Sequence, residues 1–322
     1  MTRDRFVIGT RASALARAQA AWVATRLETA WPELRIEVRT FSTAGDRDTA
    51  TPIPAIGGKG LFTADIERQL RSETIDAAVH SLKDLPTESD DGLELLAIPT
   101  RADPRDVLVL APRQARSVEG LGDLAAAATV GTSSVRRAAQ VAALRPDLHV
   151  VPLRGNVETR LSRLEAGEFD AIVLAAAGLL RLGVDRCRTI PLVPPTWLPA
   201  PGQGALAVQG RASDARARRL LASIDDPATR AETTAERAFL HRLGGGCHVP
   251  VAALAESDGT RLTLDGAVYA IGPGRTPLTG RERGGSAEAA AIGERLAERF
   301  FAAGVSRLLA GGRTGDGRGA SV

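Results

Sequence analysis

A cysteine within a run of glycines is the side chain of this sequence best suited to covalent chemistry. Cys247 lies in GGGCHVP (244–250). Glycines let a large group approach the backbone, and a thiol on an open loop can serve as a nucleophile or as an attachment point. The alternative is a half-buried structural cysteine, which is our interpretation of Cys187 at an expected helix end. His241 and His248 lie nearby, but no second ligand pair has zinc spacing.

A lysine and an aspartate stand side by side in HSLKDLP (80–86), directly after an apolar run. Lys83 and Asp84 therefore follow the carboxyl end of a predicted strand, which is where open α/β sheets bind ligands. A lone carboxylate at that position could hold a cation or the N–H donors of a pyrrole-type ring. The alternative is a surface turn closed by a salt bridge.

Two segments combine a strand end, hydroxyl side chains, a helix start and arginine. The unpaired N–H groups and the dipole of such a helix start attract anions, and arginine adds bidentate contacts to carboxylate or phosphate. Simple helix capping by Ser13 or Ser133, with the arginines on a solvated face, is the alternative for either segment alone. Their recurrence favours a ligand cleft between two lobes. The segments are GTRASAL (9–15) and GTSSVRR (131–137), with Arg11, Ser13, Ser133, Arg136 and Arg137.

Further cations lie in two other segments. LRGNVETRLSRL (153–164) places Arg154 after a strand and Arg160 on the helix that follows. GGKGLF (57–62) lacks the Ser or Thr that follows the lysine of a P-loop, because Gly60 follows Lys59. This segment is interpreted as a flexible loop with one cation, or as a plain surface turn.

The composition limits the classes of partner. The chain has 322 residues, a net charge of +3 and 25% charged residues, which is typical of a globular protein. Aromatic residues make up 3%, too few for the stacking platforms of nucleic-acid binders. We therefore expect no nucleic-acid partner, and an acidic small molecule suits the arginines better. Without a leader-like start, a membrane-length apolar run or a disulfide framework, the sequence favours the reducing cytoplasm.

The predicted elements indicate two similar α/β lobes. Strands are expected at 5–10 and 33–43, with a helix over 12–30 between them, so the chain begins as a βαβ unit with parallel strands. A short strand, a Gly-Thr-Ser turn and a helix recur at 129–144. IDAAVHSLKDLP (75–86) is echoed by FDAIVLAAAGLLRLG (169–183) in the same order.

The remaining chain has a different organisation. Proline-rich segments near 98–106 and 191–204 predict crossings between the lobes. Beyond residue 225 we expect a helix at 231–243, strands after 244 and at 261–271, and a helix at 286–304. These do not alternate as βαβ units, so they predict a small α+β domain.

Taken in order, these motifs resemble the porphobilinogen deaminase (hydroxymethylbilane synthase) family over about residues 5 to 310. No single string is decisive, but the ordered set is highly specific. The strings are GTRASALARAQ, GGKGLF, AVHSLKDLP, DPRD, VGTSSVRR, LRGNVETRL, AGLLRLG, PGQGA and GGGCHVP.

The resemblance implies an α/β fold of three domains, two of them doubly wound lobes like those of periplasmic binding proteins and the third a small α+β domain with an antiparallel sheet. The expected division is 1–99 with 200–222, then 100–199, then 226–310, with a disordered tail at 311–322.

The resemblance also implies the chemistry. Four porphobilinogen molecules are condensed head to tail, with loss of ammonia, to the linear tetrapyrrole hydroxymethylbilane. A dipyrromethane cofactor, bound through a thioether to Cys247, primes the chain. Asp84 matches the catalytic carboxylate and is expected to stabilise the cationic azafulvene-like electrophile and to manage protons.

Acetate and propionate arms make the growing chain polyanionic, so the resemblance implies many binding partners. Expected cofactor ligands, besides Cys247, are Lys83, Thr132, Ser133, Ser134, Arg136, Arg137, Arg154 and Arg160. Expected substrate ligands are Arg11, Ser13, Lys59, Phe62, Arg181 and Gln203. Two departures from the family pattern are Ala55, where some members have a second lysine in the 55–62 loop, and Pro152, where a small polar residue is common.

Two other functions remain open on the residues alone. A non-catalytic, two-lobed binder of an acidic solute explains the paired arginine segments but not Cys247. A thiol-dependent hydrolase or transferase explains Cys247 but gives the arginines no role. A blocked Cys247 thiol favours the deaminase, whereas a free, reactive Cys247 thiol favours the hydrolase or transferase.

Overall fold

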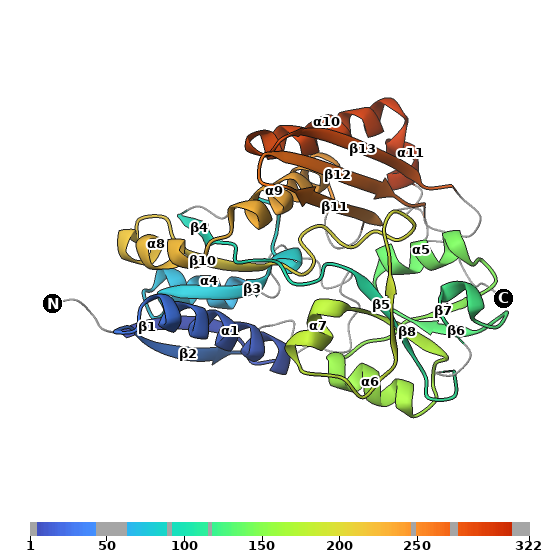
Figure 1. Ribbon diagram of the computed structural model, residues 1–322, viewed down its shortest axis with the longest axis horizontal. Helices are drawn as coiled ribbons and strands as arrows, with labels where there is room; N and C mark the ends of the chain where they lie inside the picture. Colours follow the sequence, from blue (N-terminus) through green and yellow to red (C-terminus); the bar gives the residue numbers. More distant parts are fainter. Residues whose placement is uncertain are drawn as a thin grey trace, which may run out of the picture.

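The computed structural model describes residues 5–42, 63–88, 92–114, 118–245, 249–270 and 276–310. Figure 1 shows three sheets, two forming lobes that lie side by side and one in a smaller domain packed against both. The expected tail at 311–322, Cys247, Lys59 and Phe62 all lie outside the described residues.

The first lobe is a five-stranded sheet of order β2-β1-β3-β10-β4. β1 runs parallel to β2 and β3, as the βαβ pattern predicted, whereas β10 runs antiparallel to β3 and β4. The elements are β1 (Arg5–Arg11), α1 (Ala14–Ala30), β2 (Arg35–Phe41), α4 (Ala64–Arg71), β3 (Ala77–Ser81), β4 (Leu93–Ala97), β10 (Leu206–Arg211) and α8 (Ala215–Leu221).

The second lobe repeats this plan with the order β7-β6-β8-β5-β9. Here β5 is the antiparallel strand and takes the place that β10 has in the first lobe. The elements are β5 (Asp106–Leu110), β6 (Thr129–Gly131), α5 (Val135–Leu144), β7 (His149–Val151), α6 (Val157–Glu165), β8 (Ala171–Ala175), α7 (Ala176–Arg181) and β9 (Thr189–Leu192).

The weak internal echo of the sequence is thus a structural repeat. Asp76 accepts a hydrogen bond from Val7 N at 2.7 Å, and Asp170 accepts one from Thr129 N at 2.8 Å, each at the start of the lobe's first parallel strand. A side chain at Gly9 would meet Ile75 Cδ1 at 2.4 Å. The corresponding Gly131 has Phe169 Cδ1 at 2.8 Å. Residues at corresponding positions of the repeat therefore close the same βαβ packing in both lobes.

The third domain is an antiparallel sheet of order β11-β12-β13, covered by helices. The Phe239 and Phe300 rings meet edge to face at 5.2 Å between two of these helices. A Cβ at Gly293 would lie 2.3 Å from Ala235 O, so only glycine permits this close helix contact. The elements are α9 (Pro227–Arg242), β11 (Val251–Ser257), β12 (Arg261–Val268), β13 (Leu278–Gly285), α10 (Ala289–Ala302) and α11 (Val305–Ala310).

The two connections between the lobes are fastened to α9 by one buried ion pair. Arg101, in the first connection, donates from Nη1 and Nη2 to Glu236 at 2.7 and 3.0 Å. Glu236, which is fully buried, also accepts from Gly202 N of the second connection at 2.6 Å and from Ala255 N of β11 at 2.8 Å. Four donors satisfy the carboxylate, which is what a buried charge requires.

Candidate functional site

The Lys83–Asp84 turn stands at the carboxyl end of β3, as predicted. A single 3₁₀ turn, Leu82–Asp84, follows the strand. Leu82 is fully buried and its N–H donates to Ala205 O at 3.1 Å, which fixes the root of the turn. The Asp84 side chain is exposed. The turn therefore presents a carboxylate outward from a rigid base.

Lys83 turns toward the second connection between the lobes rather than toward Asp84. Its Nζ donates to Gln203 Oε1 at 3.2 Å. Burial lowers the pKa of Lys83 to about 8, against the opposing effect of the Asp84 charge. The charges of Arg136 and Arg137 lower it as well, so residues of both lobes act on this ammonium.

Asp106, the first residue of β5, is the fully buried anion of the site. It accepts from Arg136 Nη1 at 2.7 Å and from Arg137 Nη2 at 2.7 Å. Trp197 Nε1 and Gln203 Nε2 also donate to it, at 2.7 and 2.8 Å. Burial raises the pKa of Asp106, but the charges and hydrogen bonds of Arg136 and Arg137 outweigh it and hold this pKa far below its ordinary range.

The two arginines of α5 are therefore not on a solvated face. Arg136 is 5% exposed and Arg137 is 6% exposed. Arg136 Nη1 also donates to Leu198 O at 2.8 Å, and Arg137 Nη1 donates to Val173 O at 2.9 Å. The sequence singled out both residues but missed Asp106, although DPRD (103–106) was among the recognised strings. A carboxylate in a turn-like string gives no sign that distant donors will bury it.

Serine caps both helix starts, but the capping residue of α5 differs from the expected one. Ser13 Oγ accepts from Ala16 N at 3.2 Å at the start of α1. Ser134, not Ser133, caps α5 by accepting from Arg137 N at 3.4 Å. Ser133 Oγ instead donates to Leu153 O at 2.9 Å, and the buried Thr132 Oγ1 accepts from Ser134 N at 3.2 Å. The hydroxyls thus order the backbone of this turn.

Two further arginines are partly buried without a carboxylate partner among the described residues. Arg160 Nε on α6 donates to Gly155 O at 2.8 Å, and Arg181 Nη2 at the end of α7 donates to Gly204 O at 2.7 Å. Burial lowers the pKa of each to about 10, and the charge of Arg137 contributes to the shift of Arg160. Both remain cations near neutral pH, so this region carries positive charge in excess.

Arg11 and Arg154 stand at the ends of strands in the two lobes. Arg11 is the last residue of β1, is partly exposed, and its charge acts on the buried His80, whose pKa is lowered to about 4 mainly by burial. Arg154 is partly exposed in the connection between β7 and α6. Both therefore lie at the carboxyl edges of the sheets, as predicted.

Of the two cysteines, Cys187 lies within the described part of the chain. Cys247 lies outside the described residues, a few positions beyond the end of α9 at Arg242. Cys187 lies in a bend before β9, not at a helix end, because α7 stops at Arg181. Its Sγ is 3.9 Å from Glu165 Oε1, and burial together with that carboxylate raises the pKa of the thiol. A raised pKa makes Cys187 a poor nucleophile, in keeping with its interpretation as structural.

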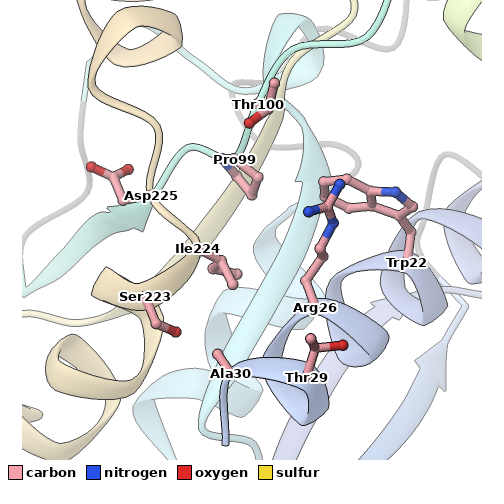
Figure 2. Close-up of a pocket in the computed structure, with 9 residues that line it drawn as sticks. All are labelled: Trp22, Arg26, Thr29, Ala30, Pro99, Thr100, Ser223, Ile224 and Asp225. Atoms are coloured by element: carbon pink, nitrogen blue, oxygen red, sulfur yellow. The ribbon is translucent and has the colours of Figure 1, made fainter.

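A separate pocket opens away from these residues, between α1 and the segments 99–100 and 223–225. Figure 2 shows the Arg26 side chain beside the Trp22 ring at its rim, and the guanidinium carbon lies 4.9 Å from the ring centroid. Asp225, also lining the pocket, is already paired with Arg230 at 2.7 Å. None of the predicted site residues lines this pocket.

Neither a metal centre nor a membrane span is found in the described part of the chain. No cluster of three or more His, Cys, Asp or Glu side chains there could hold a metal ion. No helix there is both long and apolar enough to cross a bilayer.

Solved structures similar to the chain are distant. A LysR-family transcriptional regulator, CbnR, matches 69% of the chain and 70% of its own length with a TM-score of 0.44 at 12% identity. Substrate-binding domain 2 of GlnP from Lactococcus lactis matches 69% of the chain and 88% of its own length, with a TM-score of 0.42 at 11% identity. The fold assignment accordingly stands on the strand orders above.

Comparisons with protein families are more direct. Residues 6–219 match the family model described as porphobilinogen deaminase, dipyromethane cofactor binding domain, and residues 230–302 match the porphobilinogen deaminase C-terminal domain. The porphobilinogen deaminase of Roseiflexus castenholzii is 48% identical, with 96% of this chain and 100% of that protein covered. That of Thermus thermophilus is 47% identical, with 94% and 98% covered. The chain belongs to the porphobilinogen deaminase family.

Proposed function

We propose that this protein is a hydroxymethylbilane synthase, a transferase that condenses four porphobilinogen molecules on a covalently bound dipyrromethane with loss of four ammonia molecules. Water then cleaves the chain from the dipyrromethane and releases hydroxymethylbilane. We further propose that it works as a monomer in the cytoplasm, with no nucleic-acid or membrane partner. Family membership over both matched domains supports the reaction.

The observation that carries the proposal is a set of three partly buried cations that have no carboxylate partner among the described residues. Lys83, Arg160 and Arg181 each have a pKa lowered by burial, and within the described ranges none of them forms an ion pair with a carboxylate. Burying cations without counter-ions is costly, so the site is suited to a ligand that brings several negative charges. The carboxylate arms of a dipyrromethane and of porphobilinogen are such charges.

The donor set of the second lobe fits the dipyrromethane. Arg136 makes both of its contacts through Nη1, so Nε and Nη2 can donate to a carboxylate of the cofactor. Arg154 and Arg160 bring further guanidinium groups from the turn and helix after β7. We propose that these residues, with Arg137, Lys83 and the hydroxyls of 132–134, hold the cofactor while Cys247 bonds to it.

The substrate side of the site is proposed to belong to the first lobe and its connections. Arg11 and Ser13 stand at the end of β1 and the start of α1, and Arg181 reaches the second connection through Gly204. Gln203 is 1% exposed, so it acts by orienting Lys83 toward the ligand rather than by broad contact. Lys59 and Phe62 remain proposed contacts of the 55–62 loop, in which Ala55 removes one possible cation.

Asp84 is the proposed catalytic residue. When bound, the dipyrromethane supplies the nucleophilic pyrrole carbon on which the chain grows. The exposed Asp84 carboxylate can face pyrrole N–H groups and stabilise the positive charge that develops as porphobilinogen loses ammonia. It can then accept the proton released when the new ring becomes aromatic again. The neighbouring Lys83 donates to Gln203 instead, so within the described ranges no ion pair occupies the Asp84 carboxylate.

The strand orders support the proposed domain division of 1–99 with 200–222, 100–199, and 226–310. β10 completes the first sheet although it follows the whole second lobe in sequence. The division places the Lys83–Asp84 turn and the arginines of α5 on different lobes, so the position of one lobe relative to the other sets their separation.

Incubation of the purified protein with porphobilinogen tests the proposal. Ammonia and hydroxymethylbilane should form in a ratio of four to one, and Asp84→Ala should form neither while keeping its circular dichroism spectrum. A wild-type protein that binds porphobilinogen but releases no ammonia would instead indicate the non-catalytic binder.

A further inference from the structure

Arg237 reaches from the third domain to the catalytic turn of the first lobe. It lies in the middle of α9 and donates from Nη1 to Leu85 O at 3.2 Å and from Nη2 to Pro86 O at 2.6 Å. These are the two carbonyl groups directly after Asp84. One guanidinium thus holds two consecutive peptide groups, a geometry that the planar fork of arginine provides and lysine does not.

A second residue of α9 contacts the same stretch. His241 Nδ1 lies 3.2 Å from Thr87 Oγ1, and it follows Arg237 by one helical turn, so both side chains project from the same face of α9. Among the described residues, those that form hydrogen bonds with residues 85–87 from outside this turn all belong to α9.

The other side of the turn is fixed independently. Leu82 N donates to Ala205 O, and a Cβ at Gly202 would lie 3.2 Å from Leu82 Cγ and 3.3 Å from Lys83 N. The turn is therefore held at its start by the second connection between the lobes and at its end by α9. Asp84 stands between these two attachments with its own side chain exposed.

The Arg237 guanidinium has no carboxylate partner among the described residues, and burial lowers its pKa to about 10. Partly burying a cation against two neutral carbonyl groups costs hydration free energy, so a gain in stability does not explain this contact. Its charge strengthens the two hydrogen bonds and restricts their geometry.

We propose that Arg237 is a positioning residue that fixes where the Asp84 carboxylate stands, since it holds the two carbonyl groups that directly follow Asp84. The inference rests on the proposed function. It predicts that loss of Arg237 slows turnover on fully loaded enzyme more than it weakens substrate binding or the fold.

Arg237→Gln provides the test, and Arg242→Gln provides the matched control. Arg242 is on the same helix but forms an exposed ion pair with Glu298, so its replacement removes the same charge without touching residues 85–87. Each protein is assayed with porphobilinogen, and kcat is divided by the fraction of enzyme that carries the cofactor by intact mass. We expect about a ten- to hundred-fold lower kcat for Arg237→Gln with KM changed much less, as small misplacements of a reacting group cause.

Further variants keep the test decisive if Arg237→Gln folds poorly. Arg237→Lys keeps the charge but contacts one carbonyl group at a time, and should recover part of the lost kcat. His241→Ala should give a smaller decrease of the same kind. If kcat per loaded enzyme in both Arg237 variants equals that of Arg242→Gln, Arg237 is only structural and the inference is wrong. If the wild-type protein itself has no turnover, the proposed function fails instead.

Discussion

Asp106 Oδ1 and Gln203 Nε2 lie 2.8 Å apart, and this contact joins the anion that holds the arginines of α5 to Lys83, the residue before the proposed catalytic Asp84. Gln203 donates through Nε2 to Asp106 and accepts through Oε1 from Lys83. The side-chain amide thus connects the charged groups of the two lobes.

Asp106→Asn should destabilise the protein strongly. The change removes the only carboxylate paired with Arg136 and Arg137 in the described part of the chain, and it leaves two buried cations uncompensated. Removing one partner of such a buried group costs about 3–5 kcal/mol, which urea unfolding can measure. Glu298→Gln, which breaks an exposed pair with Arg242, is the control and should change little. Equal, small effects in both variants would show that Asp106 does not stabilise the arginines.

Arg181→Leu and Arg136→Leu should separate ligand binding from stability. Arg181 has a lowered pKa and only a carbonyl contact, so its loss should change the free energy of unfolding by less than about 1 kcal/mol while raising KM roughly ten-fold or more.

Arg136→Leu should reduce both stability and the fraction of enzyme loaded with cofactor, because Asp106 loses a partner. An Arg181→Leu variant with wild-type KM, or an Arg136→Leu variant with full stability and occupancy, would contradict these assignments.

Substrate binding should weaken as the pH rises through about 8. Lys83, which we assign to the cofactor, is protonated below its lowered pKa of about 8 and loses its charge above it. Because the cofactor is then held less firmly where porphobilinogen must meet it, KM for porphobilinogen should increase on the alkaline side. Lys83→Arg keeps a charge throughout this range and should not show the increase. Profiles of log KM against pH for the two proteins give the measurement, and identical alkaline limbs would exclude Lys83 as the titrating group.

Asp84→Ala should retain the fold and lose turnover. Its side chain is exposed, so little stability depends on it, whereas general acid–base and electrostatic roles typically contribute about 10²- to 10⁴-fold in rate. The matched control is Asp258→Ala, an exposed aspartate in the third domain that caps a turn by accepting from Thr260 and Arg261. Comparable activity in the two variants would remove Asp84 from the mechanism.

The lobes could be predicted because their pattern is local. A strand, a glycine turn and a helix with a serine cap recur in order, and the repeated Asp76 and Asp170 close them in the same way. β10 was harder to place, since it joins the first sheet after an intervening lobe and its position depends on pairing with β3 and β4 far away in sequence.

The candidate site was predictable in its cations but not in what holds them. Arg136, Arg137 and Lys83 could be recognised from the type and spacing of residues, whereas the burial of Asp106 depends on Trp197 and Gln203 from distant segments. Arg237 gave no signal, because a helical arginine usually faces solvent. Long-range burial, which no local pattern encodes, turned these ordinary residues into parts of the site.

The most direct test of the whole account is the intact mass of the protein produced with porphobilinogen available. The account predicts a mass that exceeds the bare chain by two pyrrole units, and the bare mass for Cys247→Ala. A wild-type mass equal to that of the bare chain, with a freely titratable Cys247 thiol, would contradict the central claim that this cysteine anchors the primer.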